Sequence, residues 1–141
     1  MSNEIKRAAE LWLCAELARL VKGPAWYPSK GGNEMADAAP VEPPFGFVMV
    51  TEAAKKLPTA QVWLLSVKIA YMSHIGDTTS AAHSAVVRAI EKAIPCLPTG
   101  YDAKHEITVH GTELAASEEF SDGEEKTHGD VFTVAMGVGR G

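Results

Sequence analysis

Cysteines and long apolar runs are both scarce in this sequence. The 141 residues include two cysteines, Cys14 and Cys96, each with apolar helical neighbours, where a small buried hydrophobe is the ordinary role. We therefore expect no disulfide. The N-terminal segment carries five charged residues within its first 17 positions, so it lacks the apolar stretch of a signal peptide or a membrane span. These features predict a chain made in the cytoplasm with no membrane partner.

An excess of positive charge is also missing. The chain has 13 basic and 18 acidic residues, and a protein that grips nucleic acid through its phosphates needs clustered Lys and Arg. The balance excludes that class, but it allows a protein past which DNA moves without sequence-specific binding. A length of 141 residues suits one domain, which buries roughly two-thirds of its unfolded surface.

The motifs of metal and cofactor sites are absent as well. Five histidines are present, but none lies in an HxxxH or HExxH pattern, and no CxxC occurs. His105 and His110 are five residues apart on a predicted strand, which places them on opposite faces. His74, His83 and His128 are scattered over predicted turns and a helix start. We expect no metal and no cofactor.

Nucleophile and phosphate motifs are missing too. No Gly-x-Ser-x-Gly pattern occurs, and Ser80 and Ser84 flank His83 on a helix where adjacent residues do not face each other. The glycine pairs at 31–32 and in the terminal GVGRG lack the following helix and lysine of a phosphate-binding loop. The sequence therefore predicts that the protein is not an enzyme.

Two segments show the three-to-four-residue periodicity of amphipathic helices. The first spans residues 2–22 and ends at Gly23-Pro24; the second spans 78–94, with Asp77 or Thr78 as the expected N-cap. The apolar positions are Ile5, Ala9, Leu13, Leu17 and Leu20 in the first segment, and Ala82, Val86, Ile90, Ala93 and Leu97 in the second.

Strand patterns occupy much of the remainder. We expect strands at 45–51, 61–73, 105–110, 113–120 and 130–138, with the Asp-Gly at 122–123 forming a C-terminal hairpin turn. Short connections favour antiparallel pairing. The predicted fold class is α+β, a single domain with a mostly antiparallel β-sheet, two amphipathic helices packed on it, and a long Pro-rich loop at 24–44.

Two surface features invite a role in assembly. The loop at 24–44 carries Trp26 and Tyr27, whose apolar area would be unusual in water. The acidic stretch at 113–125 includes Glu118, Glu119 and Asp122, which could be a solvated hairpin tip, an acid–base pair, or an arm that repels DNA or meets a basic neighbour. We interpret these five residues as possible lumen or subunit contacts, and we expect charge reversal of the acidic three to disturb assembly more than folding.

The order of elements resembles a known family. A long N-terminal helix, a Pro-rich loop, the strand VWLLSVKIAYMS, the helix TTSAAHSAVVRAIEKAI and the final VFTVAMGV together resemble the tail terminator and related neck subunits of long-tailed bacteriophages. The resemblance implies a homo-oligomeric, hexameric ring that caps the tail tube and joins the head-side connector, without enzymatic activity or cofactor. It implies location in the virion, after assembly in the host cytoplasm. No motif of the family allows a residue role to be transferred.

Two alternatives stay open. The first is another head–tail connector or tail completion subunit, which would share composition and many elements. The second is a small α+β ligand-binding domain or enzyme with a pocket between helices and sheet near Trp63 and Tyr71, although two aromatic residues at these positions also suit an ordinary core.

Overall fold

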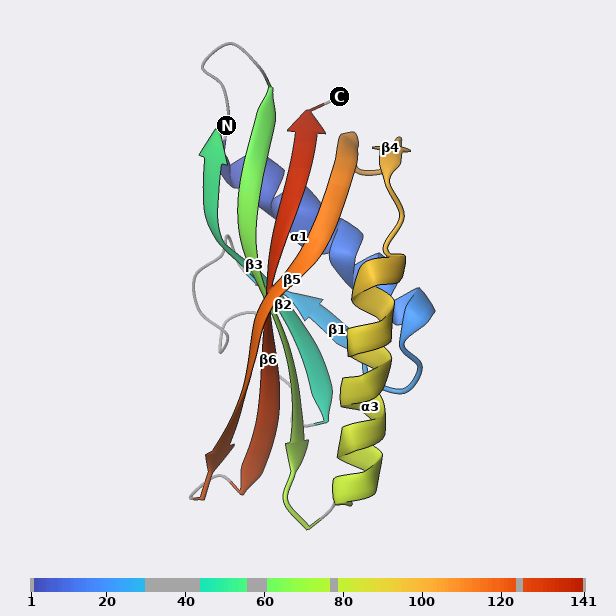
Figure 1. Cartoon of the computed structure of the whole chain (residues 1–141), viewed down its shortest axis with the longest axis vertical. Coiled ribbons are helices and arrows are strands. Elements are labelled where there is room, and N and C mark those ends of the chain that lie inside the picture. Colours follow the sequence, from blue (N-terminus) through green and yellow to red (C-terminus); the bar gives the residue numbers. More distant parts are fainter. Residues whose placement is uncertain (1, 30–43, 56–60, 77–78, 124–125, 141) are drawn as a thin grey trace.

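The computed structural model describes residues 2–29, 44–55, 61–76, 79–123 and 126–140 (Figure 1). The described elements, in chain order, are α1 (Ser2–Leu20), β1 (Trp26–Pro28), β2 (Phe45–Lys55), β3 (Val62–His74), α3 (Ser80–Ala93), a 3₁₀ turn (Ile94–Cys96), β4 (Gly100–Asp102), β5 (Ile107–Asp122) and β6 (Thr127–Arg140). The predicted α+β class with two helices is confirmed. Neither helix in these ranges is long and apolar enough to cross a membrane.

The six strands form one twisted sheet in the order β1-β2-β3-β6-β5-β4. Only β1 runs parallel to its neighbour, β2, and the other four pairings are antiparallel, as expected. In Figure 1, α1 crosses the upper half of the sheet and α3 stands along its lower half. The last residues of β5 and the first residues of β6 lie at the lower end of the molecule in this view.

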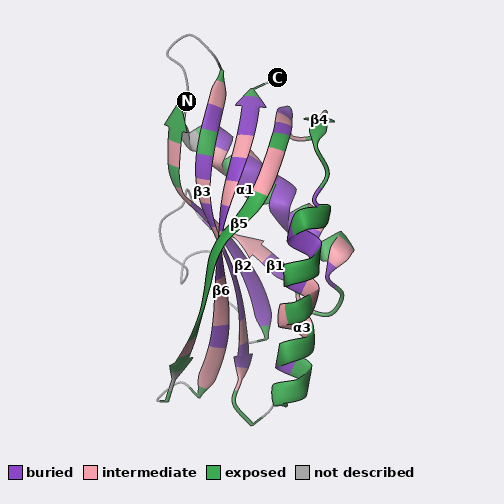
Figure 2. Cartoon of the chain, viewed as in Figure 1, coloured by how far each residue is buried: buried purple, intermediate pink, exposed green. Residues whose placement is uncertain are grey.

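The core lies between the helices and one face of the sheet. Alternate residues of β3, from Trp63 to Tyr71, point to this face and are buried, as the predicted alternation requires. Their antiparallel partners on β6 are buried on the same face, because Ile69 pairs with Phe132 and Val67 with Val134. Figure 2 shows these positions alternating with less buried ones along both strands. A smaller apolar cluster around Phe45 and Phe47 lies on the opposite face.

β5 corrects the prediction of two strands at 105–110 and 113–120. It is one strand of 16 residues whose register shifts between Val109 and Gly111 and again between Leu114 and Ala116. Each bulge adds a residue and moves the alternation to the other face, so the sequence pattern looks interrupted. Gly111 is not a turn but pairs with Gly137. His105 precedes the strand in a turn, so its predicted place on a common strand with His110 was wrong.

The predicted loop at 24–44 begins with a strand that the sequence did not indicate. Trp26 of β1 pairs with Gly46 of β2, and a Cβ at Gly46 would lie 2.2 Å from the Trp26 ring. Only glycine leaves room for the indole there. The rest of that predicted loop lies mostly outside the described residues. β2 also continues to Lys55, beyond the predicted end of this strand at residue 51.

The helix ends and the cysteines differ in detail from expectation. Thr79 is the N-cap of α3 and accepts a hydrogen bond from the Ala82 backbone N–H, so the cap lies later than Asp77 or Thr78. Cys14 is buried, and burial raises the pKa of its thiol to about 12. Cys96 is exposed because it ends the 3₁₀ turn after α3, which corrects its expected burial.

A buried acid joins α1 to the edge of the sheet. β1 covers β2 only from Gly46 to Val48, so the next β2 backbone donors need another acceptor. Glu10 is fully buried, and its Oε2 accepts hydrogen bonds from the Val50 N–H at 2.9 Å and from the Ser29 hydroxyl. Burial raises the pKa of Glu10, and the two hydrogen bonds oppose the rise. One helical carboxyl group thus completes the strand edge that β1 leaves open.

Candidate functional site

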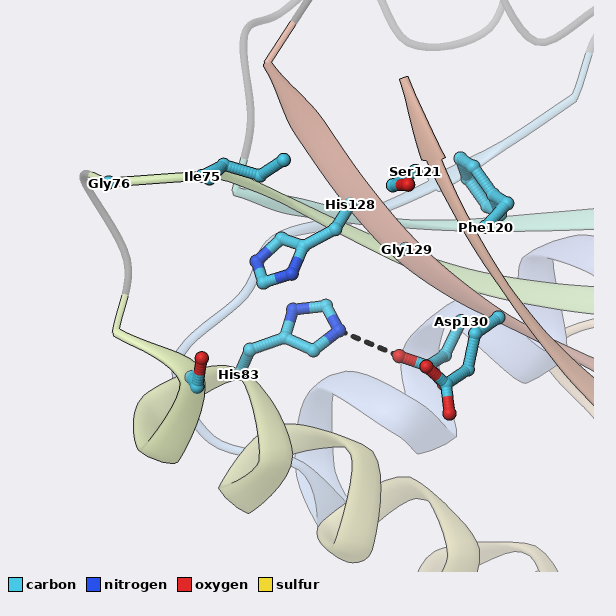
Figure 3. A pocket seen from close by; sticks show the side chains of 10 residues that line it. Ile75, Gly76, His83, Phe120, Ser121, His128, Gly129 and Asp130 are labelled. Carbon is cyan, nitrogen blue, oxygen red and sulfur yellow. Dashed lines mark hydrogen bonds and ion pairs between the residues drawn. The ribbon is translucent and has the colours of Figure 1, made fainter. Parts of the chain in front are cut away.

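A group of polar side chains lies between the N-terminal half of α3 and the lower half of the sheet. Two adjoining cavities of about 560 and 460 Å³ open there. Both are lined by Ser80 and His83 of α3, by Glu119 of β5, and by His128 and Asp130 of β6. Figure 3 shows the two histidine rings facing each other across the gap between helix and strand.

Local structure brings these side chains together. His83 lies on the same side of α3 as Ile90, two helical turns later, and both are buried. His128, Asp130 and Phe132 occupy every second position of β6 and therefore share its helix-facing side. The sequence interpretation left His83 and His128 scattered, and the structure corrects it. Extending the alternation of the last strand upstream from residue 130 would have placed His128 on this face.

A hydrogen-bonded chain runs through His83. Its Nε2 lies 2.7 Å from Asp130 Oδ2, and its Nδ1 lies 2.7 Å from Ser73 Oγ. A carboxylate can only accept, so His83 Nε2–H donates to Asp130. In the neutral ring, Nδ1 then accepts the hydroxyl hydrogen of Ser73. These two contacts fix the start of α3 to β3 and β6 at once.

Two more rings hold His83 in place. The His128 ring stacks on it with centroids 4.1 Å apart and planes inclined by 26°, and the Tyr71 ring lies 5.0 Å away. Burial lowers the pKa of His128, the neighbouring His83 lowers it further, and Asp130 opposes the shift. His128 Nε2 is buried and has no hydrogen-bond partner among the described residues. The neutral form of His128 is therefore favoured in the folded protein.

Ser73, His83 and Asp130 are the residue types of a serine hydrolase triad. A substrate cannot reach the serine, however. Ser73 has no exposed surface, so its hydroxyl cannot approach a substrate. No three His, Cys, Asp or Glu side chains within the described ranges could hold a metal ion. The geometry favours a structural role, in which buried polar groups satisfy one another and attach α3 to the sheet.

The predicted acidic contacts do not form one cluster. Glu118 and Glu119 are both exposed, but Glu119 lines the histidine cavity whereas Glu118, opposite Val131, points to the other face of the sheet. Asp122 pairs with Thr127 at the end of the β5–β6 ladder. Adjacent strand residues point to opposite faces, so a run of acids in the sequence divides its charge between two surfaces.

Trp26 and Tyr27 lie on opposite faces of the sheet edge. Trp26 belongs to the main core, and its apolar area is covered within this chain. Tyr27 is half-buried and meets Phe45 edge-on, with ring centroids 6.3 Å apart and planes at 75°. Contact of either residue with a neighbouring subunit stays a prediction.

The pocket considered near Trp63 and Tyr71 does not match the cavities beside α3. Trp63 is buried at the other end of β3, with Lys55 Nζ 5.7 Å from its ring centroid. Tyr71 is buried beneath His83. Neither residue lines the two cavities beside α3, so both aromatics serve as core there.

Comparison with known proteins finds similarity in structure and none in sequence families or curated proteins. No protein-family model matches the chain, and no curated protein does. Among solved structures, the fold is similar to a chain of the virion of a native gene transfer agent particle, with a TM-score of 0.53 and 15% sequence identity. The match covers 96% of this chain and 93% of that chain. At this identity the match establishes a shared fold across nearly the whole domain.

Proposed function

We propose that this chain is a structural protein of a phage-like virion. Within that class, we propose the tail terminator: a ring-forming subunit, with a hexamer expected, that caps the tail tube and joins it to the head-side connector. The fold likeness to a chain of a gene transfer agent virion carries the proposal, because it spans nearly all of both chains. DNA would pass through the ring without sequence-specific contacts.

Two features of the molecule support a structural role over a catalytic one. The Ser73–His83–Asp130 chain is used internally, with its serine fully buried. The exposed part of β5 instead offers a long strand edge, and the unpaired backbone groups of such an edge can pair with another chain. The proposal therefore includes the absence of enzymatic activity and of a cofactor.

Purified protein mixed with isolated tail tubes tests the proposal. We expect light scattering to detect a ring, alone or on the tubes, and electron microscopy to show one extra disc at a single tube end. A protein that stays monomeric and leaves both tube ends bare would overturn the proposal.

The nearest alternative is another head–tail connector or tail completion subunit. The same experiment separates the two positions if isolated head connectors are included as a second binding partner. Binding to connectors in the absence of any binding to tail tubes would favour the alternative over the terminator.

A further inference from the structure

The free edge of β5 is the largest unpaired strand edge in the described part of the sheet. β4 pairs with β5 only from Ile107 to Val109, so residues 110–122 have no described strand on that side. All seven residues from Glu113 to Glu119 are exposed, and in Figure 2 β5 is green over much of its lower half. An edge of this length presents a row of unused backbone donors and acceptors.

The same edge combines apolar surface with negative charge. Leu114 is 38% exposed and is followed by two exposed alanines. Glu113 and Glu118 pair across the ladder with Ala135 and Val131, which places both carboxylates on the face away from the helices. Neither carboxylate has an ion-pair partner among the residues that the structure describes. We call residues 113–118 the acidic edge.

A surface of opposite character lies beside the start of β5. A depression of about 510 Å³ is formed by α1, the β4–β5 turn and the end of β6. Its floor includes Ala8 and Leu11, the latter 36% exposed, and its cations are Arg7, Lys104 and Arg140. One acid, Glu4, also lines it and lies 3.4 Å from Arg140. We call this surface the basic depression.

We propose that the acidic edge of one subunit docks in the basic depression of a second copy of the chain. The inference rests on the proposed ring-forming function and names its subunit interface. Each surface has exposed apolar groups bordered by charge, which is negative on the edge and mainly positive in the depression, and interfaces between specific partners typically show such complementarity. A contact between two different surfaces is heterologous, so repeated copies generate a closed ring when the rotation per subunit allows closure.

Charge reversal on each surface separately gives a direct test. The edge variant carries Glu113→Lys and Glu118→Lys, and the depression variant carries Lys104→Glu and Arg140→Glu. Glu119 is left unchanged because it lines the histidine cavity. A control variant with Lys22→Glu and Lys92→Glu reverses two exposed charges outside both surfaces and outside the histidine cavities. Circular dichroism verifies that every variant is folded.

Each variant surface should repel its own copies but attract the other variant. In the edge variant both surfaces are positive, and in the depression variant both are negative. We expect each alone to shift in light scattering from the ring to the 15.0 kDa monomer, and an equimolar mixture to restore the ring with alternating subunits. The control should assemble like the unmodified protein.

Two outcomes separate this inference from the proposed function. If the unmodified protein forms rings on tail tubes but folded variants assemble alone, or their mixture stays monomeric, the interface is wrong and the proposed function stands. If the unmodified protein forms no oligomer, with or without tubes, the proposed function fails and the interface fails with it.

Discussion

Replacement of Glu10 tests how α1 completes the edge of the sheet. The change to Leu removes the acceptor for the Val50 N–H and the Ser29 hydroxyl, both in a fully buried place. A buried donor left without a partner costs about 1–3 kcal/mol. The two unsatisfied donors destabilise the variant, whereas removal of the buried carboxyl group stabilises it. We therefore expect the free energy of unfolding to fall by about 2–4 kcal/mol. Glu10→Gln keeps an acceptor at the same place and should cost under about 1 kcal/mol.

The pH dependence gives Glu10 a second signature. Burial raises the pKa of Glu10 in the folded state above the ordinary glutamate value of 4.5, so the folded protein binds this proton more tightly than the unfolded chain does. The resulting stabilisation is fully present below pH 4.5 and is lost as pH rises through the folded pKa. Denaturant unfolding across this window should show the unmodified protein losing stability relative to Glu10→Gln as pH rises. Equal stability of the Leu and Gln variants would refute the assigned hydrogen bonds.

Three further predictions concern the fold and the histidine cavity. Gly46→Ala should lower the melting temperature by several degrees, because its Cβ would force the Trp26 ring out of the core; a scanning calorimeter measures this, and an unchanged transition would contradict the packing. His83→Ala should speed amide exchange at the start of α3 more than elsewhere, because it breaks both hydrogen bonds to the sheet; uniform exchange would argue against the anchor. His128→Phe should flatten the pH dependence of stability below pH 6.5. The neutral form of His128 stabilises the fold above that pH, and this contribution is lost as pH falls through the lowered pKa of His128. An unaltered pH profile in unfolding titrations would contradict the lowered pKa.

Local periodicity predicted the helices and strands that bury one face along an uninterrupted sequence pattern. The spacing of Leu13 and Leu17 is enough for α1, and the alternation from Trp63 to Tyr71 is enough for β3, because each pattern directly reflects one buried face. β5 escaped this reasoning because two bulges shift its alternation midway. β1 escaped because three residues ending in Pro28 carry no periodic signal at all.

The polar site depended on contacts that no local pattern encodes. His83 and Asp130 are 47 residues apart in sequence, and their meeting depends on where α3 packs. Glu10 looked like one of several surface charges near the N-terminus, yet it is buried because the short β1 leaves β2 backbone groups to be satisfied. Long-range hydrogen bonding, rather than a local pattern of side chains, determines the positions of His83 and Glu10.

The proposed position of this chain is a ring at the joint between the tail and the head of a phage-like virion. This position can be examined by tagging the chain and locating the tag on intact particles by electron microscopy. We expect one ring of label at the head-proximal end of the tail tube. Label elsewhere on the particle would contradict the terminator role, and particles without any label would contradict the structural role itself.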